Sequence, residues 1–262
     1  MAMVITFAEP ITSLVFRRII RELEPRTFAK GLTNRQPMQM VSVNFNPTGP
    51  QVQQSISSGM QFQKLSLVRV DENQVANKVV EELSIDPNHI LYRNMNYSWW
   101  ENVSGSYWEM CSDSISSIVE SVPLRTVRLE YLDRFIYDGD PEAATADGVI
   151  RRESELVSPH IFNLTDLWHS HTGKLEKTKG EDRRLFQVNI DMVDMVDDPG
   201  SLPRRSISIM SAVEERFGGT GMDSATADTL RATFDDLHDE VKVLFRNAVD
   251  SQMLATVGLD NE

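Results

Sequence analysis

Cysteine is nearly absent from this chain, since Cys111 is the single cysteine among 262 residues. No disulfide can form within the chain, so an intracellular setting is the expected one. No stretch approaches the roughly 18 uninterrupted apolar residues of a membrane-spanning helix, and no basic segment precedes an apolar run at the N-terminus. These absences predict a cytoplasmic protein that does not cross a membrane.

Basic residues are also scarce, with 26 Lys and Arg against 39 Asp and Glu and a formal net charge of −13. This charge argues against a general nucleic-acid-binding protein, because contacts with phosphates supply most of that affinity. We therefore expect another protein, or a second copy of this one, as the binding partner, rather than nucleic acid or a membrane. No cofactor is expected.

Arginine occurs in four adjacent pairs. These pairs would form one basic surface if the fold brought them together, and otherwise they lie separately at solvated ends of strands and loops. The pairs are Arg17-Arg18, Arg151-Arg152, Arg183-Arg184 and Arg204-Arg205.

The first 60 residues predict few regular elements. Residues 11–20 are rich in β-branched and aromatic side chains, which favours a strand, and a short helix is expected at residues 27–32. Residues 33–59 contain several prolines and glycines among polar side chains. They are expected to form a long polar loop, with one short strand at residues 40–45.

Three strands are predicted next, at residues 61–70, 74–84 and 89–97. The polar segments 71–73 and 86–88 between them are typical of tight turns. These strands therefore predict an antiparallel meander.

A long helix is expected between Ser98, which can cap it, and Pro123, which ends it. Its apolar side chains recur at spacings of three and four residues. Trp99, Trp100 and Trp108 lie in this region. Tryptophans at helical spacing usually belong to a core, and the alternative is that they line a ligand-binding cavity.

The stretch from residue 123 to residue 140 has the alternation of a half-buried strand, with Tyr131 and Phe135 among its apolar positions. Asp133 falls on the same apolar side. An unpaired carboxylate there would be costly or protonated, so either Asp133 has a partner or the strand ends early.

The second half of the chain repeats the pattern of the first. A short helix is predicted at residues 149–156, three strands at residues 167–175, 184–196 and 205–216, and a long helix over residues 230–248. Asp223-Ser224 offers a cap for this last helix, and Gly258 suits its end.

These elements predict an α+β fold in a single domain over residues 1–262. The domain would consist of two similar halves, at about residues 1–122 and 123–262. Each half would hold a strand, a short helix, a three-stranded antiparallel meander and a long helix, with the helices packed on one face of antiparallel sheet.

Two groups of side chains could carry chemistry. His169 and His171 flank one residue on a predicted strand, so they point to the same side and could share a metal ion. Asp133, Asp191 and Asp194 could act as paired carboxylates. Asp191 and Asp194, however, are three residues apart on a strand and are expected to face opposite sides.

Several short motifs carry a resemblance to a known family. The run from Glu130 to Arg134, EYLDR, resembles the Arg-Tyr-any-Asn-Arg signature strand of a sporadically distributed family of uncharacterised bacterial proteins. Tyr131 and Arg134 match it, whereas Glu130 and Asp133 replace Arg and Asn. The segments NYSWWENV, VNID and Leu237-His238 are similar to further parts of that family. The resemblance implies no activity, and some members lie near mobile-element or toxin and antitoxin genes, which implies a role in bacterial conflict.

Three functions are compatible with these observations. The favoured one is a non-enzymatic protein-interaction module of a bacterial cytoplasmic system, which binds through a sheet edge, the polar loop or the acidic last helix. The second is a small-ligand-binding module with an aromatic-lined cavity. The third is a metal-dependent hydrolase using His169 and His171. The residues predicted to bind a partner or ligand are Tyr131, Asp133, Arg134, Trp99 and Trp100.

Overall fold

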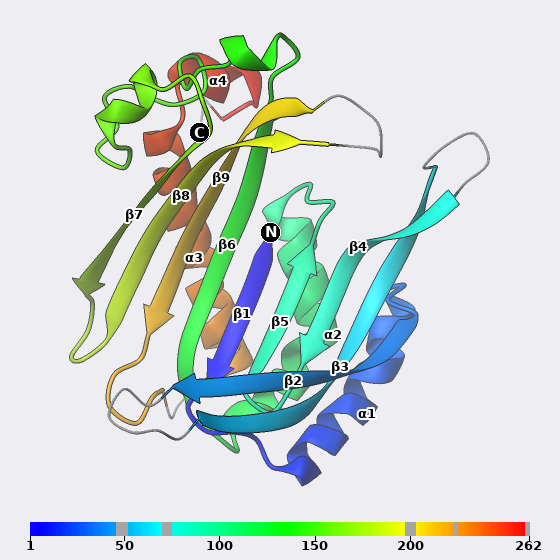
Figure 1. The fold of residues 1–262 in the computed structure, drawn as a ribbon. Helices are drawn as coiled ribbons and strands as arrows, with labels where there is room; N and C mark the ends of the chain where they lie inside the picture. Colours follow the sequence, from blue (N-terminus) through cyan, green and yellow to red (C-terminus); the bar gives the residue numbers. More distant parts are fainter. Residues whose placement is uncertain (46–51, 70–74, 197–202, 223–224, 260–262) are drawn as a thin grey trace. The chain divides into compact units, whose positions relative to one another are not determined.

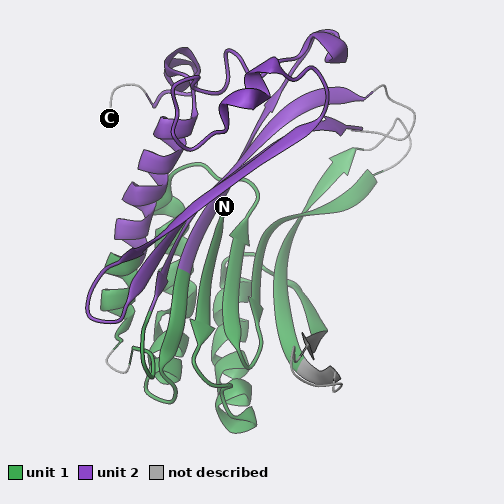
Figure 2. Ribbon diagram, turned by 60° about the vertical axis from the view of Figure 1, so that its left-hand side comes forward, with its two compact units in different colours: residues 1–127, 217–233 green, residues 128–216, 234–262 purple. Residues whose placement is uncertain are grey.

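The computed structural model describes residues 1–45, 52–69, 75–196, 203–222 and 225–259, which form an α+β fold with antiparallel strand pairs. The chain divides into two compact units (Figure 2). Unit 1 comprises Met1–Val127 and Phe217–Thr233, and unit 2 comprises Arg128–Arg216 and Phe234–Glu262. Unit 1 thus includes a segment from the predicted second half. Among the described helices, none is long and apolar enough to cross a membrane.

Five strands of unit 1 lie in the order β2-β3-β4-β5-β1 (Figure 1). They are β1 (Ala2–Phe7), β2 (Asn34–Phe45), β3 (Val52–Arg69), β4 (Val75–Ile85) and β5 (His89–Asn94). The predicted meander is confirmed as β3, β4 and β5. Its second turn is held by Asp86, whose Oδ1 accepts hydrogen bonds from the backbone N–H groups of Asn88 at 2.6 Å and His89 at 3.0 Å. The first predicted turn lies outside the described residues.

The strand predicted at residues 11–20 is wrong, because these residues enter helix α1 (Ser13–Ala29). The Oγ1 atom of Thr12 caps the helix by accepting the backbone N–H of Val15 at 3.3 Å. Ile19, Ile20 and Leu23 are buried at helical spacing. Burial of this stripe outweighs the strand preference of β-branched side chains. The short helix predicted at residues 27–32 overlaps the end of α1.

The long loop predicted at residues 33–59 is also wrong. This segment contains β2 and part of β3, paired from Asn34 opposite Gln63 to Phe45 opposite Val52. Polar side chains are compatible with a strand, because the backbone hydrogen bonds of a hairpin do not depend on them. Residues 46–51 lie outside the described residues.

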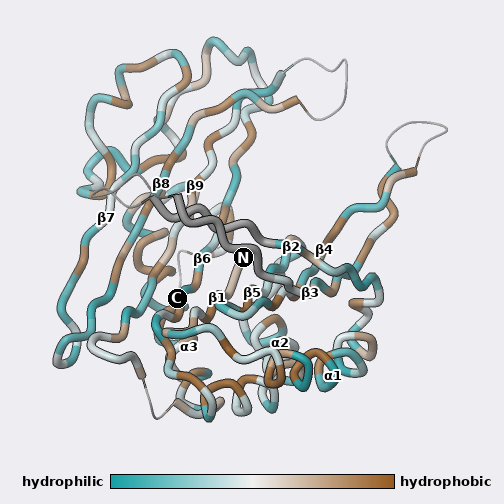
Figure 3. Tube along the Cα trace, turned by 60° about the horizontal axis from the view of Figure 1, so that its bottom comes forward, coloured by the Kyte–Doolittle hydropathy of each residue, from teal (hydrophilic) through white to brown (hydrophobic). Residues whose placement is uncertain are grey.

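Helix α2 (Trp100–Val119) confirms the first long helix, although Trp99 rather than Ser98 is its N-cap residue. Apolar residues recur along α1 and α2 (Figure 3). Tyr107 of α2 packs on Tyr92 of β5, with ring centroids 5.3 Å apart. The core of unit 1 therefore lies between α2 and the strands, and α1 contacts α2 directly.

Unit 2 contains the strand order β6-β9-β8-β7. Its strands confirm the predicted ones, and β6 begins at the end of unit 1. They are β6 (Leu124–Ile136), β7 (Trp168–Lys177), β8 (Arg183–Met195) and β9 (Arg204–Arg216).

The connection from β6 to β7 contains two 3-10 turns, η1 (Pro141–Ala143) and η2 (Pro159–Asn163), and not the helix predicted at residues 149–156. Ile150 instead forms a bridge with Val249 and is buried. The backbone groups near Ile150 thus bond to a distant segment rather than within a helix.

The last predicted helix is confirmed as α3 (Ala227–Ala248), followed by α4 (Ser251–Thr256). The apolar stripe of α3 is fully or almost fully buried, as its spacing predicts. Its members are Leu230, Phe234, Leu237, Val241, Leu244 and Ala248. The predicted cap at Asp223-Ser224 lies outside the described residues. Gly258 follows α4 with φ +77°, a conformation that glycine adopts readily.

Candidate functional site

Strand β6 divides the predicted binding residues between its two sides. Val127 and Leu129 are buried, which confirms the alternation. Tyr131 lies on the same side, where its hydroxyl is 3.0 Å from Nδ1 of His238 on α3. Two segments of the bacterial-family resemblance, around Tyr131 and at Leu237-His238, therefore contact each other in unit 2.

Asp133 follows Tyr131 on this side of β6 and is half-buried. Within the described part of the chain, its carboxylate forms no hydrogen bond, and burial raises its pKa to about 6. Arg134 is exposed, and its Nη1 lies 3.4 Å from Sδ of Met195. Because neighbouring residues of a strand point to opposite sides, Asp133 and Arg134 do not form one site.

The tryptophans belong to unit 1 and have different environments. Trp100 and Trp108 are 7% and 5% exposed, whereas Trp99 is 68% exposed. Trp100 and Trp108 thus pack in the core, as their helical spacing predicts, and Trp99 faces solvent.

His169 and His171 lie on the same exposed side of β7, with ring centroids 5.3 Å apart. Nε2 of His171 is 3.0 Å from Oδ1 of Asp191. Asp194 accepts a hydrogen bond from Nε of Arg205 at 2.7 Å, so the two aspartates have separate partners. Across the described residues, no group of three or more His, Cys, Asp or Glu side chains could hold a metal ion.

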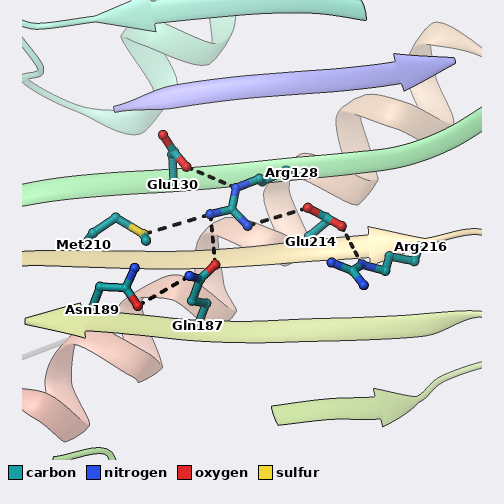
Figure 4. Close-up of polar contacts among 7 residues, drawn as sticks. All are labelled: Arg128, Glu130, Gln187, Asn189, Met210, Glu214 and Arg216. Carbon is teal, nitrogen blue, oxygen red and sulfur yellow. Dashed lines mark hydrogen bonds and ion pairs between the residues drawn. The ribbon is translucent and has the colours of Figure 1, made fainter. Parts of the chain in front are cut away.

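A polar network centred on Arg128 occupies the other side of the β6, β8 and β9 strands (Figure 4). Arg128 contacts Glu130 at 3.0 Å, Glu214 at 3.5 Å and the side-chain oxygen of Gln187 at 3.2 Å. Arg216 in turn pairs with Glu214 at 2.5 Å. Two cations thus meet two carboxylates, and this charge-matched arrangement fits a structural role better than catalysis.

A two-stranded arm extends from the sheet of unit 1 (Figure 1). We define it as residues 65–69 of β3 and 75–79 of β4, which pair with each other. Strand β2 pairs with β3 only as far as Gln63, and β5 pairs with β4 only from Glu81 onward. Among the described residues, neither strand therefore pairs with the arm. A register shift between Lys64 and Leu65 marks the base of the arm, where such an irregularity increases strand twist.

One side of the arm carries four of its apolar side chains together with two polar ones. On this side Leu65 pairs with Val79, Leu67 with Asn77 and Val75 with Arg69. Leu67 is 74% exposed and Val75 is 62% exposed. The arm carries Arg69 and Lys78 on opposite sides, and Asp71 and Glu72 stand in the segment that joins its strands, outside the described residues.

Two cavities lie away from the predicted site residues. One in unit 1, of about 340 Å³, is bordered by Phe28 and Phe62. The other, in unit 2, has a volume of about 610 Å³ and lies between α3, β7, β8 and residues 151–156.

Neither the arm nor the unit 2 cavity was predicted from the sequence. The strands of the arm were predicted, but their exposure depends on where β2 and β5 stop, and no local pattern specifies that. The cavity depends on the irregular segment that replaces the helix expected at residues 149–156.

No family model matches the chain, and no curated protein matches it. A solved structure described as the di-domain ARO/CYC StfQ from the steffimycin biosynthetic pathway aligns with 93% of this chain and 94% of its own, at 8% identity. The TM-score of 0.18 is too low for this likeness to support a fold or a function. The resemblance of EYLDR to the bacterial family remains a prediction.

Proposed function

We propose that the protein is a non-enzymatic protein-interaction module and that the arm is its binding surface. The observation that carries this proposal is a group of exposed apolar side chains on one side of the arm, Leu65, Leu67 and Val75, with half-buried Val79 at its base. Exposed apolar side chains that gather on one surface commonly mark a protein interface.

The isolation of the arm strengthens this argument. A two-stranded hairpin is marginally stable in water without further packing. Covering Leu67 and Val75 with a partner would remove apolar surface from water and stabilise the arm. Full burial of such a side chain contributes about 1.5–3 kcal/mol.

The charges of the arm do not select the charge of the partner. Arg69 and Lys78 lie on opposite sides of the arm, Asp71 and Glu72 stand between its two strands in the sequence, and Lys64 at its base lies 3.7 Å from Glu81. The partner we propose is a protein with an apolar contact area that covers Leu67 and Val75.

The alternatives have less support. The proposed aromatic cavity would be lined by Trp99, Trp100, Trp108 and Tyr131, and none of these residues borders either of the two cavities described above. The metal-dependent hydrolase would need a third ligand beside His169 and His171, and the described residues offer no such group. The bacterial-family resemblance, if correct, would place the module in a cytoplasmic system linked to mobile elements or toxin–antitoxin conflict.

The test is to purify the protein from its own host, identify the co-purifying protein by native mass spectrometry, and measure the dissociation constant by calorimetry. Leu67→Asp should raise the dissociation constant roughly tenfold or more, because it places a carboxylate in the apolar contact. Ser66→Asp adds the same charge on the other side of the arm and is the matched control.

An identified partner protein whose binding is weakened by Leu67→Asp but much less by Ser66→Asp would support the proposal. Equal affinity of Leu67→Asp and the unchanged protein would exclude the arm. If the protein forms a homodimer that Leu67→Asp dissociates, the arm is still the binding surface, and the partner is a second copy of this chain.

We also propose that the two halves arose by duplication and that their long helices pack on one face of antiparallel sheet. In support, β1 pairs with β5, the last strand of its own meander, and β6 likewise neighbours β9. A long helix follows each meander, α2 in the first half and α3 in the second.

A further inference from the structure

The unit 2 cavity combines apolar walls with a small number of charged groups. Val243 and Leu244 of α3 line one side, and Phe186 of β8 lines another. Val243 is 49% exposed, whereas Phe186 and Leu244 are 7% and 5% exposed. A volume of about 610 Å³ falls within the range of small-molecule sites. The cavity can therefore accept the apolar body of a small ligand.

Arg151 is a cation lining this cavity whose guanidinium has no partner among the described residues. Its backbone N–H donates to the carbonyl of Ala248 at 2.9 Å, but its guanidinium forms no hydrogen bond or ion pair with the described residues. Arg152 differs, since its Nη2 contacts both carboxylate oxygens of Asp147, at 2.7 and 2.9 Å, and its guanidinium lies over the ring of Phe162. The guanidinium of Arg152 is therefore paired within the protein, whereas that of Arg151 is paired with none of the described residues.

A second cation, Lys174, lines the same cavity but is already engaged. Its ammonium donates to Glu176 at 2.6 Å and lies 4.7 Å from the centroid of the Phe186 ring. Lys174 therefore adds positive potential at the apolar wall without requiring a ligand.

The carboxylates at the cavity limit the charge of a ligand. Glu240 is 3.7 Å from Arg184, so its charge is partly balanced within the protein. Glu153 and Glu155 also line the cavity and are exposed. These two carboxylates would repel a multiply charged phosphate more strongly than a single carboxylate. A guanidinium binds a carboxylate in a bidentate manner.

We propose that the unit 2 cavity binds an amphipathic monocarboxylate, with its apolar chain against Val243, Leu244 and Phe186 and its carboxylate on Arg151. This site is independent of the arm, which belongs to unit 1, so either proposal can fail without the other.

Titration calorimetry of the full chain with decanoate tests this site, and decanol serves as an uncharged probe of similar length. Arg151→Ala should raise the dissociation constant for decanoate by roughly 10- to 100-fold, because hydrogen bonds to charged groups contribute that much. Arg152→Ala is the matched control and should leave the constant unchanged. Decanol should bind the unchanged protein as weakly as decanoate binds Arg151→Ala.

The fold should tolerate Arg151→Ala, because the guanidinium has no hydrogen bond or ion pair to lose among the described residues. Val243→Asp provides a second variant at a half-exposed position and should also weaken decanoate binding, since it places a carboxylate against the chain. Absence of decanoate binding to the unchanged protein would overturn the proposal. Equal affinities of the Arg151→Ala and Arg152→Ala variants, or equal binding of decanol and decanoate, would do so as well.

Discussion

The two units bury carboxylates on their strands but satisfy them with different donors. In unit 1, the hydroxyl of Tyr92 donates to Glu81 at 2.7 Å, and the nearest cation, Lys64, is 3.7 Å away. In unit 2, Nε of Arg184 donates to Glu215 at 2.6 Å, and Thr178 donates to the same carboxylate at 2.7 Å. The first carboxylate depends mainly on a neutral donor and the second on a cation.

This difference shows how each unit joins its helices to its strands. Arg184 also contacts Asp236 at 2.7 Å and Glu240 at 3.7 Å, so one half-buried guanidinium links β8 and β9 to α3. Burial alone would lower the pKa of Arg184, but hydrogen bonds and charges from Glu215 and Asp236 raise it. Unit 1 instead packs Tyr107 of α2 on Tyr92, the residue that also holds Glu81.

The largest effect is expected from Arg184→Ala. This change leaves Glu215 buried beside a single neutral donor, and breaking a buried ion pair typically costs about 3–5 kcal/mol. Urea unfolding of the variant should show a loss in the free energy of unfolding of about that size. Arg183→Ala is the control, because Arg183 donates to the backbone carbonyls of Glu181 and Asp182 rather than to a buried carboxylate. Equal losses in the two variants would contradict the role given to Arg184.

A smaller loss is expected from Tyr92→Phe. The phenylalanine keeps the ring against Tyr107 but removes the donor to Glu81, and an unsatisfied buried acceptor costs about 1–3 kcal/mol. Tyr137→Phe is the control, since Tyr137 is 42% exposed. The comparison of the units requires the loss from Tyr92→Phe to be smaller than that from Arg184→Ala in the same urea titration. The reverse order would mean that unit 1 depends more strongly on its polar pair.

Strands and helices could be predicted from the sequence where one side of the element is apolar along its whole length. Strands β7 to β9 and helices α2 and α3 follow their expected periods. The prediction failed at α1, where Ile19 and Ile20 favour a strand locally but become buried as part of a helix. It also failed at β2, because apolar and polar side chains alternate too weakly along this segment to predict a strand.

The proximity of two candidate residues could be predicted from the sequence only where both lie on the same strand or helix. His169 and His171 share a side of β7 because a strand has a period of two residues. Tyr131 and His238 are 107 positions apart, and the cavity at Arg151 is lined by residues from segments as distant as Asn247. Sequence spacing does not encode such contacts, so these features required the structure.

Asp133 extends the comparison to a third carboxylate, which lacks a hydrogen bond among the described residues. Its pKa is about 6 in the folded protein, above the ordinary value of 3.8, because burial disfavours the charged form. The folded state should therefore lose stability as the pH rises from about 4 to 6, by roughly 1–2 kcal/mol after allowance for partial exposure. Asp133→Asn cannot titrate, so the difference in unfolding free energy between it and the unchanged protein should change across this interval and become constant above it. A difference that stays constant from pH 4 to pH 7 would show that the pKa of Asp133 is the same in the folded and unfolded protein, as it would be for an exposed carboxylate.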